Sequence, residues 1–533
     1  MKKIILFLGF VLAQLNLFAQ EKEIGIDERI NEIFGQATGW FVNIIFYEIP
    51  LTATVKVYWV LFPLVLGALY FTLRFSFPGI RFFGIAINTV RGKYDDVAMA
   101  ATDLNVADGD NPDTIRIEGQ EGEVSHFQAL TAALSATVGL GNIAGVAVAV
   151  VIGGAGATFW MIVCGLLGMA TKFVECTLGV KYREVDENGK VYGGPMYYLS
   201  KGLGEKNMAG LGKVLAVLFA IMCIGGSFGG GNMFQSNQAA SIFLNTFGVS
   251  SPASGAIFGL VMAILVGIVI LGGIKRIASV TEKVVPFMAA IYVGAALIVL
   301  IMNIGLVPKA MVTIVTEAFA PTAVAGGFLG ALIQGFRRAA FSNEAGIGSA
   351  AIAHSAVKTD APASEGIVAL LEPFIDTVVI CTMTALVIVI ANLKGDFVLG
   401  AVDGAVKLTE GGASLSGVDL TSYVFNTTIP GFNYVLTFAV VLFAFSTMIS
   451  WSYYGLQSWT YLFGRTKTME SLYKIIFCIF VIVGGAASLS NVIDFSDAMI
   501  FAMMVPNMIG LFILMPKVKE ELAKYLAKIK HIK

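Results

Sequence analysis

The sequence predicts an all-α membrane protein that crosses the bilayer many times. Of its 533 residues, 57% are hydrophobic and 13% are charged, which lies outside the composition of soluble globular domains. The apolar residues gather in blocks long enough to cross the bilayer core, with polar loops between them. Two of these blocks are interrupted, at residues 135–145 and 341–349, by glycine, asparagine and small polar residues. Backbone groups freed at membrane depth must face protein, water or a ligand, so the two breaks predict a central binding site.

Composition argues against several classes of function. The 35 Lys and Arg residues balance the 36 Asp and Glu residues, so the chain offers no basic surface for nucleic acid. With three histidines and five cysteines that lack CxxC spacing, the sequence indicates neither a disulfide framework nor a catalytic metal. It also lacks a nucleophile elbow and a phosphate-binding loop, so we predict that the protein is not an enzyme.

The amino terminus has the pattern of a secretory signal peptide. Residues 1–19 combine Lys2 and Lys3 with an apolar core and a cleavage site near Ala19; the alternative is an uncleaved first helix. Residues 20–55 mix charged and apolar positions as expected for a helix lying in the outer interface of the membrane. Cleavage would place the mature amino terminus outside the cell, which suits a bacterial inner-membrane protein.

Eleven membrane spans are predicted after these segments. Residues 56–125 hold one additional N-terminal span, at about 57 to 77, and a cytoplasmic loop. The approximate limits of ten core helices are 126–152, 157–180, 212–245, 255–273, 282–305, 322–356, 366–392, 431–456, 471–488 and 496–515. Each break opens a set of five, so 126–305 and 306–515 are predicted to form two repeats. An odd number of helices per repeat turns the second repeat upside down, which is typical of secondary transporters.

Charge predicts the orientation of these helices. Short cytoplasmic loops carry an excess of lysine and arginine. With the mature amino terminus outside, the predicted inner loops hold Lys275 with Arg276 and Arg465 with Lys467, and the basic tail at 516–533 is also inside. The carboxyl terminus is therefore predicted to be cytoplasmic.

The first break has the chemistry of a site for a cation and a carboxylate. Gly139 and Gly141 permit unusual backbone angles, and Asn142 offers a carboxamide. Unwinding exposes carbonyl groups that can bind a small cation and amide groups that can bind a carboxylate. Sodium and an amino acid would satisfy both. The alternative is a glycine-rich face for helix packing.

The second break places Ser342, Asn343 and Glu344 at membrane depth, where desolvating one unpaired polar group costs about 1–3 kcal/mol. Glu344 could bind a substrate amine, support a cation or clamp the broken helix through backbone hydrogen bonds, and we favour the clamp. Phe341 is either a lid or floor of the pocket or a core residue.

Two arginines, Arg337 and Arg338, lie one turn before the second break. At this depth they are expected either to line an aqueous vestibule, as a gate, or to pair with acids inside the spans. The candidate acids are Glu175, Glu372 and Asp376.

Five motifs, taken in order, closely resemble the alanine or glycine:cation symporter family of the amino acid-polyamine-organocation superfamily. They are SATVGLGNIAGVAVA from Ser135, GGPMYYL from Gly193, KRIASVTEKVVPFMA from Lys275, FSNEAGIGSAAIAHSA from Phe341 and STMISWSYYG from Ser446. The resemblance runs from about residue 50 to 515. It implies the leucine-transporter-like fold of two inverted five-helix repeats, and sodium-coupled uptake of alanine or glycine.

The resemblance also implies site residues, motif by motif. Those for the substrate are Gly141, Asn142, Gln235, Phe341, Ser342, Asn343, Thr447 and Trp451. Those for sodium, through carbonyl and hydroxyl oxygens, are Thr137, Val138, Ser446 and Thr447. As alternatives, Gln235 forms a helix-to-helix hydrogen bond, and the hydroxyls of the sodium set bond carbonyl groups of their own helices. Trp451 above a small substrate would restrict the pocket to tiny side chains.

We therefore predict a sodium-coupled symporter that imports alanine, glycine or both across the bacterial inner membrane by alternating access. Its partners would be a small amino acid and the lipid bilayer. The competing hypotheses are a sodium- or proton-coupled symporter for another small solute and an uncoupled channel or receptor. A channel cannot concentrate alanine against its gradient, so coupling discriminates between them. The sequence leaves open the choice among glycine, L-alanine and D-alanine, the number of ions and the oligomeric state.

Overall fold

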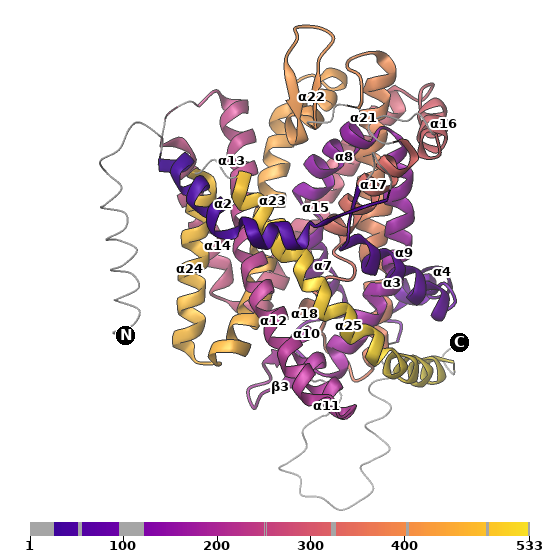
Figure 1. Cartoon of the computed structure of the whole chain (residues 1–533), viewed down its shortest axis with the longest axis vertical. Helices are drawn as coiled ribbons and strands as arrows, with labels where there is room; N and C mark the ends of the chain where they lie inside the picture. Colours follow the sequence, from indigo (N-terminus) through magenta and orange to yellow (C-terminus); the bar gives the residue numbers. More distant parts are fainter. Residues whose placement is uncertain are drawn as a thin grey trace, which may run out of the picture.

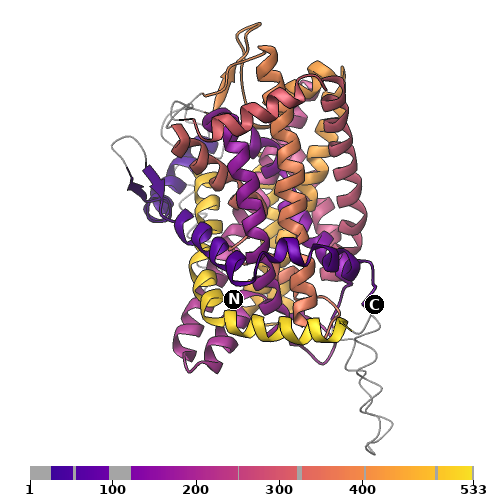
Figure 2. The same ribbon diagram turned by 90° about the vertical axis from the view of Figure 1, so that its right-hand side faces the viewer.

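Helices make up most of the chain and run side by side as a bundle (Figures 1 and 2). A computed structural model describes residues 26–51, 56–94, 122–249, 251, 253–320, 327–400, 404–486 and 490–530. Seven helices of this described part are long and apolar enough to cross a membrane, and one bent pair of helices makes an eighth candidate. The predicted all-α, multi-pass architecture is therefore confirmed, whereas its division into two inverted repeats stays a prediction.

The helices between residues 126 and 302 follow the predicted core spans, with breaks inside two of them. Their bounds are α7 (His126–Thr137), η3 (Gly141–Gly145), α8 (Val146–Gly153), α9 (Gly156–Lys181), α10 (Pro195–Tyr197), η4 (Tyr198–Gly202), α11 (Leu203–Glu205), α12 (Ala209–Phe228), η5 (Gly229–Met233), α13 (Phe234–Phe247), α14 (Ser254–Ile270) and α15 (Gly273–Met302). The segments labelled η are π-helical turns. The predicted long third span is an α12–η5–α13 rod that covers 39 residues.

The second half has helices of membrane length at four of its five predicted spans, two separate short helices on either side of the break at the fifth (322–356), and two helices that were not predicted. Its bounds are α16 (Val307–Ala318), α17 (Gly327–Asn343), α18 (Ala350–His354), α19 (Pro362–Ala369), α20 (Leu371–Pro373), η6 (Phe374–Cys381), α21 (Thr382–Lys394), α22 (Gly417–Thr428), α23 (Phe432–Phe463), α24 (Lys467–Ala486) and α25 (Ser490–Ile529). The unpredicted helices, α22 at the top and α16 at the upper right, both lie in the upper part of the molecule in Figure 1.

Three short antiparallel hairpins connect helices in the described part of the chain. They are β1 (Glu48–Pro50) with β2 (Lys56–Tyr58), β3 (Glu184–Val185) with β4 (Val191–Tyr192), and β5 (Ala405–Lys407) with β6 (Ser414–Ser416). The last of these lies beside α22 at the top of Figure 1, and β3 lies at the opposite end. The hairpins therefore lie outside the helical core.

The additional N-terminal span differs from its prediction. Its position holds α3 (Leu61–Arg74), which at 1.5 Å per residue is about 21 Å long and so shorter than a bilayer core of about 30 Å. The chain then turns through Ser76 and Phe77, both with left-handed φ angles (54° and 56°), into α4 (Pro78–Arg81) and α5 (Phe83–Val90). Proline cannot continue a helix hydrogen-bond ladder, and it disfavours helical angles in the residue before it. A single long helix therefore ends here.

Both chain ends are only partly described. The predicted signal peptide, residues 1–19, lies outside the described residues. The predicted interfacial segment forms α2 (Ile26–Ile45), which packs on α25: the Phe41 and Phe495 rings lie 5.9 Å apart. Much of the predicted tail belongs to α25, whose last turns run across the base of the bundle in Figure 2. Whether either segment lies at a membrane surface stays a prediction.

A candidate binding site between the two broken helices

The first break is confirmed as an interruption of the helix. α7 ends at Thr137, Val138 is extended (φ −76°, ψ 91°), and the chain resumes as η3 and α8 after a bend of 52°. The Asn142 side-chain oxygen accepts a hydrogen bond from the Gly139 backbone N–H at 2.8 Å. One amide group that the break removes from the helical ladder is thereby satisfied by a side chain.

The second break is confirmed as well. α17 ends at Asn343, and three of the next five residues have left-handed φ angles: Glu344 (54°), Gly346 (92°) and Gly348 (93°). The Asn343 side-chain oxygen accepts a hydrogen bond from the Ala345 N–H at 3.0 Å. The Glu344 carboxylate accepts a hydrogen bond from the Ser349 hydroxyl, which lies just before α18. Glu344 thus joins the two ends of the break through a side-chain hydroxyl and not through the backbone hydrogen bonds that the clamp hypothesis expects, so its role as a clamp stays a prediction.

The two breaks meet at a small central cavity. It is lined by Ala136, Thr137, Gly139, Leu140, Gly141, Gly230, Gln235, Phe341, Ser342, Glu344, Thr447, Trp451 and Ile500, and has a volume of about 20 Å³. This is room for little more than one water molecule, so even a small ligand requires side chains to move. Six of the eight residues implied for the substrate line the cavity; their role stays a prediction.

Gln235 presents an unused acceptor at this cavity. Its side-chain N–H donates to the Gly230 carbonyl at 3.0 Å, which is a contact within its own helical rod and not the helix-to-helix bond considered above. Its Oε1 is buried without a hydrogen-bond partner among the described residues. A Cβ added at Gly139 would lie 3.8 Å from this oxygen. The oxygen therefore faces the first break, and a buried acceptor of this kind is costly unless a ligand bonds it.

Asn142 and Asn343 do not line the cavity but tie the breaks to η6. Asn142 donates to the Asp376 carboxylate at 2.6 Å, and Asn343 donates to the Thr377 hydroxyl at 3.0 Å. Ser342 also donates to Asp376, at 2.8 Å. One fully buried carboxylate thus holds a residue of each break. Sequence reasoning considered Asp376 only as an arginine partner; an acid inside an apolar span was the signal that could have found this role.

The residues implied for sodium gather where α7 packs on α23. Thr447 donates to the Ser135 carbonyl at 3.0 Å, and the Ser135 hydroxyl donates to the Ser446 carbonyl at 2.7 Å. The hydroxyls of Thr137 and Ser446 bond carbonyl groups of their own helices, at 3.3 and 2.9 Å, which is the alternative considered above. The contact nevertheless brings carbonyl and hydroxyl oxygens from both helices together, and such oxygens suit a hard cation.

Gly139 is the position at which this packing leaves no room for a side chain. A Cβ there would lie 2.7 Å from the Thr447 Oγ1. We expect Gly139→Ala to push Thr447 away from Ser135 and to reduce the apparent sodium affinity at least 10-fold, measured as the sodium dependence of uptake. Gly145→Ala, in the same broken helix, is the control, because a Cβ there meets nothing closer than 3.8 Å. Equal sodium affinities for the two variants would contradict the expectation.

Comparison with known proteins assigns the chain to a family. The model of the sodium:alanine symporter family matches residues 43–533. The chain belongs to this family. It is therefore a multi-pass membrane protein and a cation-coupled amino acid symporter, and the sequence resemblance is confirmed.

Relatives of this symporter include transporters that are named for different substrates. It is 43% identical to the sodium/alanine symporter AgcS of Methanococcus maripaludis over 453 residues, which cover 85% of this chain and 90% of AgcS. It is 36% identical to the probable sodium/glutamine symporter GlnT of Bacillus subtilis, over 75% of this chain and 78% of GlnT. The crystal structure of MhsT in complex with L-phenylalanine shares the fold at a TM-score of 0.50 and 16% identity, covering 74% of this chain and 89% of MhsT.

The acids expected to pair with the two arginines of the symporter are engaged elsewhere. Glu372 pairs with Lys172, Glu175 accepts from Asn507, and Asp376 accepts from Asn142. The predicted ion pairs with these acids are therefore wrong.

The arginines have other neighbours. The Arg337 guanidinium lies over the Tyr58 ring, 5.0 Å from its centroid. Arg338 is partly buried beside Gly145, and its buried Nε has no hydrogen-bond partner in the described part of the chain. The role of Arg338 as a gate stays a prediction.

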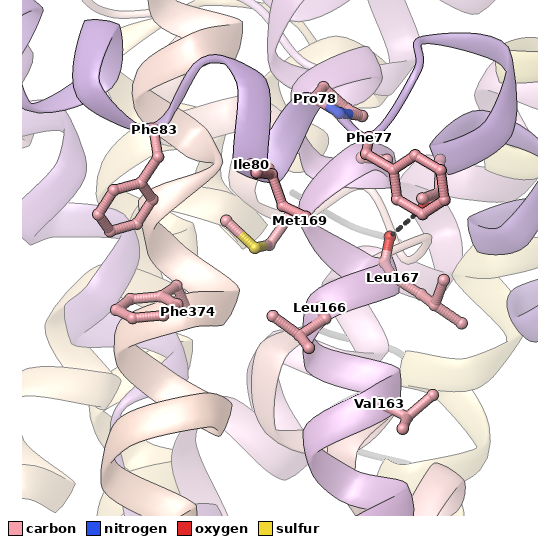
Figure 3. Close-up of a pocket in the computed structure, with 12 residues that line it drawn as sticks. Phe77, Pro78, Ile80, Phe83, Val163, Leu166, Leu167, Met169 and Phe374 are labelled. Atoms are coloured by element: carbon pink, nitrogen blue, oxygen red, sulfur yellow. Dashed lines mark hydrogen bonds between the residues drawn. The ribbon is translucent and has the colours of Figure 1, made fainter.

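A larger cavity of about 550 Å³ shares no lining residue with the central cavity (Figure 3). It lies between α4, α5, α9 and η6. Its labelled side chains are apolar, and Phe83 faces Phe374 with 4.9 Å between ring centroids. The Thr72 hydroxyl at its edge is bonded to the Leu167 carbonyl at 3.4 Å. A zwitterion would find no polar partner here, so the small central cavity is the better amino acid site of this symporter.

Proposed function

We propose that the protein is a sodium-coupled symporter that imports alanine or glycine across the bacterial inner membrane by alternating access. One observation carries this choice: the two unwound segments meet at a very small cavity, and the side chain of one lining residue, Gln235, has an acceptor oxygen without a hydrogen-bond partner among the described residues. A ligand that fits must be small and must bring a hydrogen-bond donor. The ammonium group of a small amino acid does both.

The substrate has a complementary place for each of its charged ends. The ammonium group bonds Gln235 Oε1. The carboxylate bonds backbone N–H groups at Gly141, where η3 begins and the dipole of the half-helix favours an anion. Trp451 and Phe341 close the cavity. Trp451 is held against Gly231, where a Cβ would lie 2.3 Å from its ring, so it has little freedom to retreat for a longer side chain.

Sodium binds at the contact between α7 and α23. The carbonyl groups of Thr137 and Val138 and the hydroxyls of Ser446 and Thr447 supply its oxygens, because unwinding at Val138 frees carbonyl groups from the helix. Sodium bound there holds the first break in the shape that the substrate carboxylate requires. The two ligands therefore favour each other's binding, which is the thermodynamic condition for coupling.

Uptake of radiolabelled alanine into proteoliposomes tests this proposal. We expect an inward sodium gradient to drive accumulation above the external concentration, and potassium alone to give none. A proton gradient imposed without sodium tests for a proton-coupled symporter, which would accumulate alanine under this condition. Downhill flux without accumulation would identify a channel. Alanine and glycine should compete for uptake, whereas glutamine should compete weakly because of the cavity's size. Strong glutamine uptake would contradict the substrate assignment.

The proposed orientation has an independent test. A single cysteine introduced near residue 530, at the end of α25, should react with an impermeant maleimide only in inside-out vesicles. All five native cysteines are buried or partly buried, which limits background labelling. Reaction from the periplasmic side would overturn the predicted topology.

A further inference from the structure

Two of the chain's three histidines meet on one buried carboxylate. His126, at the start of α7, contacts Glu365 on α19, and His354, the last residue of α18, contacts the same carboxylate at 2.5 Å. Glu365 and His354 are fully buried, whereas the His126 side chain is 13% exposed. These three contacting side chains thus extend from the protein surface, at His126, into the protein interior, at His354.

The chain of ionisable groups continues from His354 to α9. The other ring nitrogen of His354 lies 3.6 Å from Glu372, and Glu372 pairs with Lys172 at 2.9 Å. All of these inner side chains are fully buried. Five ionisable residues from α7, α18, α19, α20 and α9 therefore form one unbroken line, His126–Glu365–His354–Glu372–Lys172, which we call the histidine–carboxylate chain.

Each inner member of this chain uses different atoms for its two neighbours. Glu365 contacts His126 through Oε2 and His354 through Oε1. His354 contacts Glu365 through Nδ1 and Glu372 through Nε2, and Glu372 contacts Lys172 through its other oxygen. A static ion pair does not require this alternation. A group that takes a proton from one neighbour and gives one to the next does require it.

The central link of the chain is open. His354 Nε2 and Glu372 Oε2 face each other at 3.6 Å, and neither has a hydrogen-bond partner among the described residues. Both atoms are buried, where an unpaired polar atom is costly. A proton shared between them, as the two groups approach by a few tenths of an ångström, would satisfy both atoms at once.

The inner end of the chain lies beside the second break. Lys172 interacts electrostatically with Glu344, which clamps the break, and with Glu175 and Cys176 on its own helix. His354 ends the short α18 that begins directly after the break. Asp376 on η6 interacts electrostatically with Glu372. Tyr454 on α23 also interacts electrostatically with Glu372 and Glu344, and Cys176 interacts with Glu372 and Glu365. Glu365 and Glu372 face His354.

We propose that the histidine–carboxylate chain carries a proton between the solvent at His126 and Glu372 at the foot of the second break, and that this proton sets the rate of transport. His126 Nδ1 gives its proton to Glu365, whose carboxyl group turns and gives it to His354 Nδ1. His354 then releases the proton on Nε2 to Glu372 Oε2. Each step breaks one N–H or O–H bond and forms one. One proton enters at His126, and one appears on Glu372.

Protonation of Glu372 has a defined local consequence. It removes the negative partner of Lys172, which then pairs with Glu344 and draws that carboxylate away from Ser349. The clamp across the second break loosens. A lower pH on the side of the membrane that His126 faces therefore slows the transport cycle. This inference rests on the proposed symport only for its effect on rate, because proton movement along the chain can be measured without transport.

Nuclear magnetic resonance of the full chain in liposomes, with ¹⁵N-labelled histidine, tests the relay without transport. Only three histidines contribute, and His126→Gln and His354→Gln assign the two that belong to the histidine–carboxylate chain. We expect the titration of His354 to shift by about one pH unit or more in His126→Gln, as for strongly coupled sites. A His354 titration unchanged in both His126→Gln and Glu372→Gln would overturn the relay.

The pH dependence of sodium-driven alanine uptake tests whether protonation of Glu372 slows transport. Across about pH 5 to pH 9, we expect the wild-type rate of uptake to fall several-fold toward acid, because small changes of environment move a histidine's charge change within this range. His126→Gln and His354→Gln should each flatten this profile, and Glu372→Gln should be slow at every pH because it imitates the protonated acid. If His354→Gln does not fold, His126→Gln at the surface end gives the same answer. A flat wild-type profile, or unaltered profiles in both histidine variants, would overturn the proposal.

The two tests separate this inference from the proposed function. Coupled histidine titrations in a protein that takes up no alanine would refute the substrate and leave the relay standing. Normal sodium-driven uptake with uncoupled titrations would refute the relay alone.

Discussion

Asp376→Asn is expected to reduce the efficiency of sodium-driven alanine uptake by about 100-fold. The carboxylate accepts hydrogen bonds from Asn142, Ser342 and Thr377, and so anchors both breaks to η6. The asparagine amide has one acceptor oxygen and one NH2 group, which only donates. In either orientation of this amide, one of the two breaks loses the acceptor oxygen to which it is hydrogen-bonded. A hydrogen bond to a charged group contributes about 1.5–3 kcal/mol, and about 2.7 kcal/mol corresponds to a factor of 100.

Initial uptake rates as a function of both alanine and sodium provide the measurement. Asp376 acts as a positioning residue, so the half-saturating concentrations of both ligands should rise together, which a loss of folded protein alone would not produce. Asp419→Asn makes the same chemical change on α22, away from the central cavity, and should leave both values unaltered. Wild-type kinetics in Asp376→Asn would show that the carboxylate does not organise the site.

Gln235→Leu is expected to raise the half-saturating alanine concentration by about 10- to 100-fold, because it removes the acceptor for the ammonium group, worth about 1.5–3 kcal/mol. Sodium binding measured without alanine should stay within about twofold of wild type, since Gln235 is not among the proposed sodium ligands. Binding of alanine and of sodium to purified protein would separate the two effects.

Gln457→Leu is a closely matched control for this experiment. Gln457 on α23 is buried, donates its amide N–H to a backbone carbonyl at 3.2 Å and has an unpartnered Oε1 among the described residues, just as Gln235 does. It does not line the central cavity. If the two variants lose the same alanine affinity, the effect reflects the burial of an amide and not ammonium recognition.

The positions of the two breaks could be predicted because they depend on local chemistry. Gly346 and Gly348 have left-handed φ angles that other residues adopt only with strain, and Asn142 and Asn343 satisfy the backbone N–H groups of Gly139 and Ala345 close by in the chain. These requirements are visible in a short stretch of sequence. The family motifs likewise indicated most of the residues that line the central cavity.

Other features could not be read from periodicity. The apolar block at 57–77 has the composition of a span, but Pro78 and the left-handed turn before it divide the chain into short helices. The length of an apolar block alone does not predict such a turn. α16 and α22 are short helices in predicted loops, where no membrane-length apolar block marks them.

The sequence by itself determined that this chain is an all-α membrane protein, where its helices unwind, and the family to which it belongs, because composition, glycine placement and motif order are properties of the linear chain. Only the tertiary structure decided what the buried charges do. Asp376 lies 234 residues from Asn142, and His126 lies 239 residues from Glu365. A charge in a low-dielectric interior is stable only beside the groups that the fold brings to it. The partners of a buried ionisable group are thus a property of packing, and the packing placed one carboxylate between the two breaks and another between two histidines.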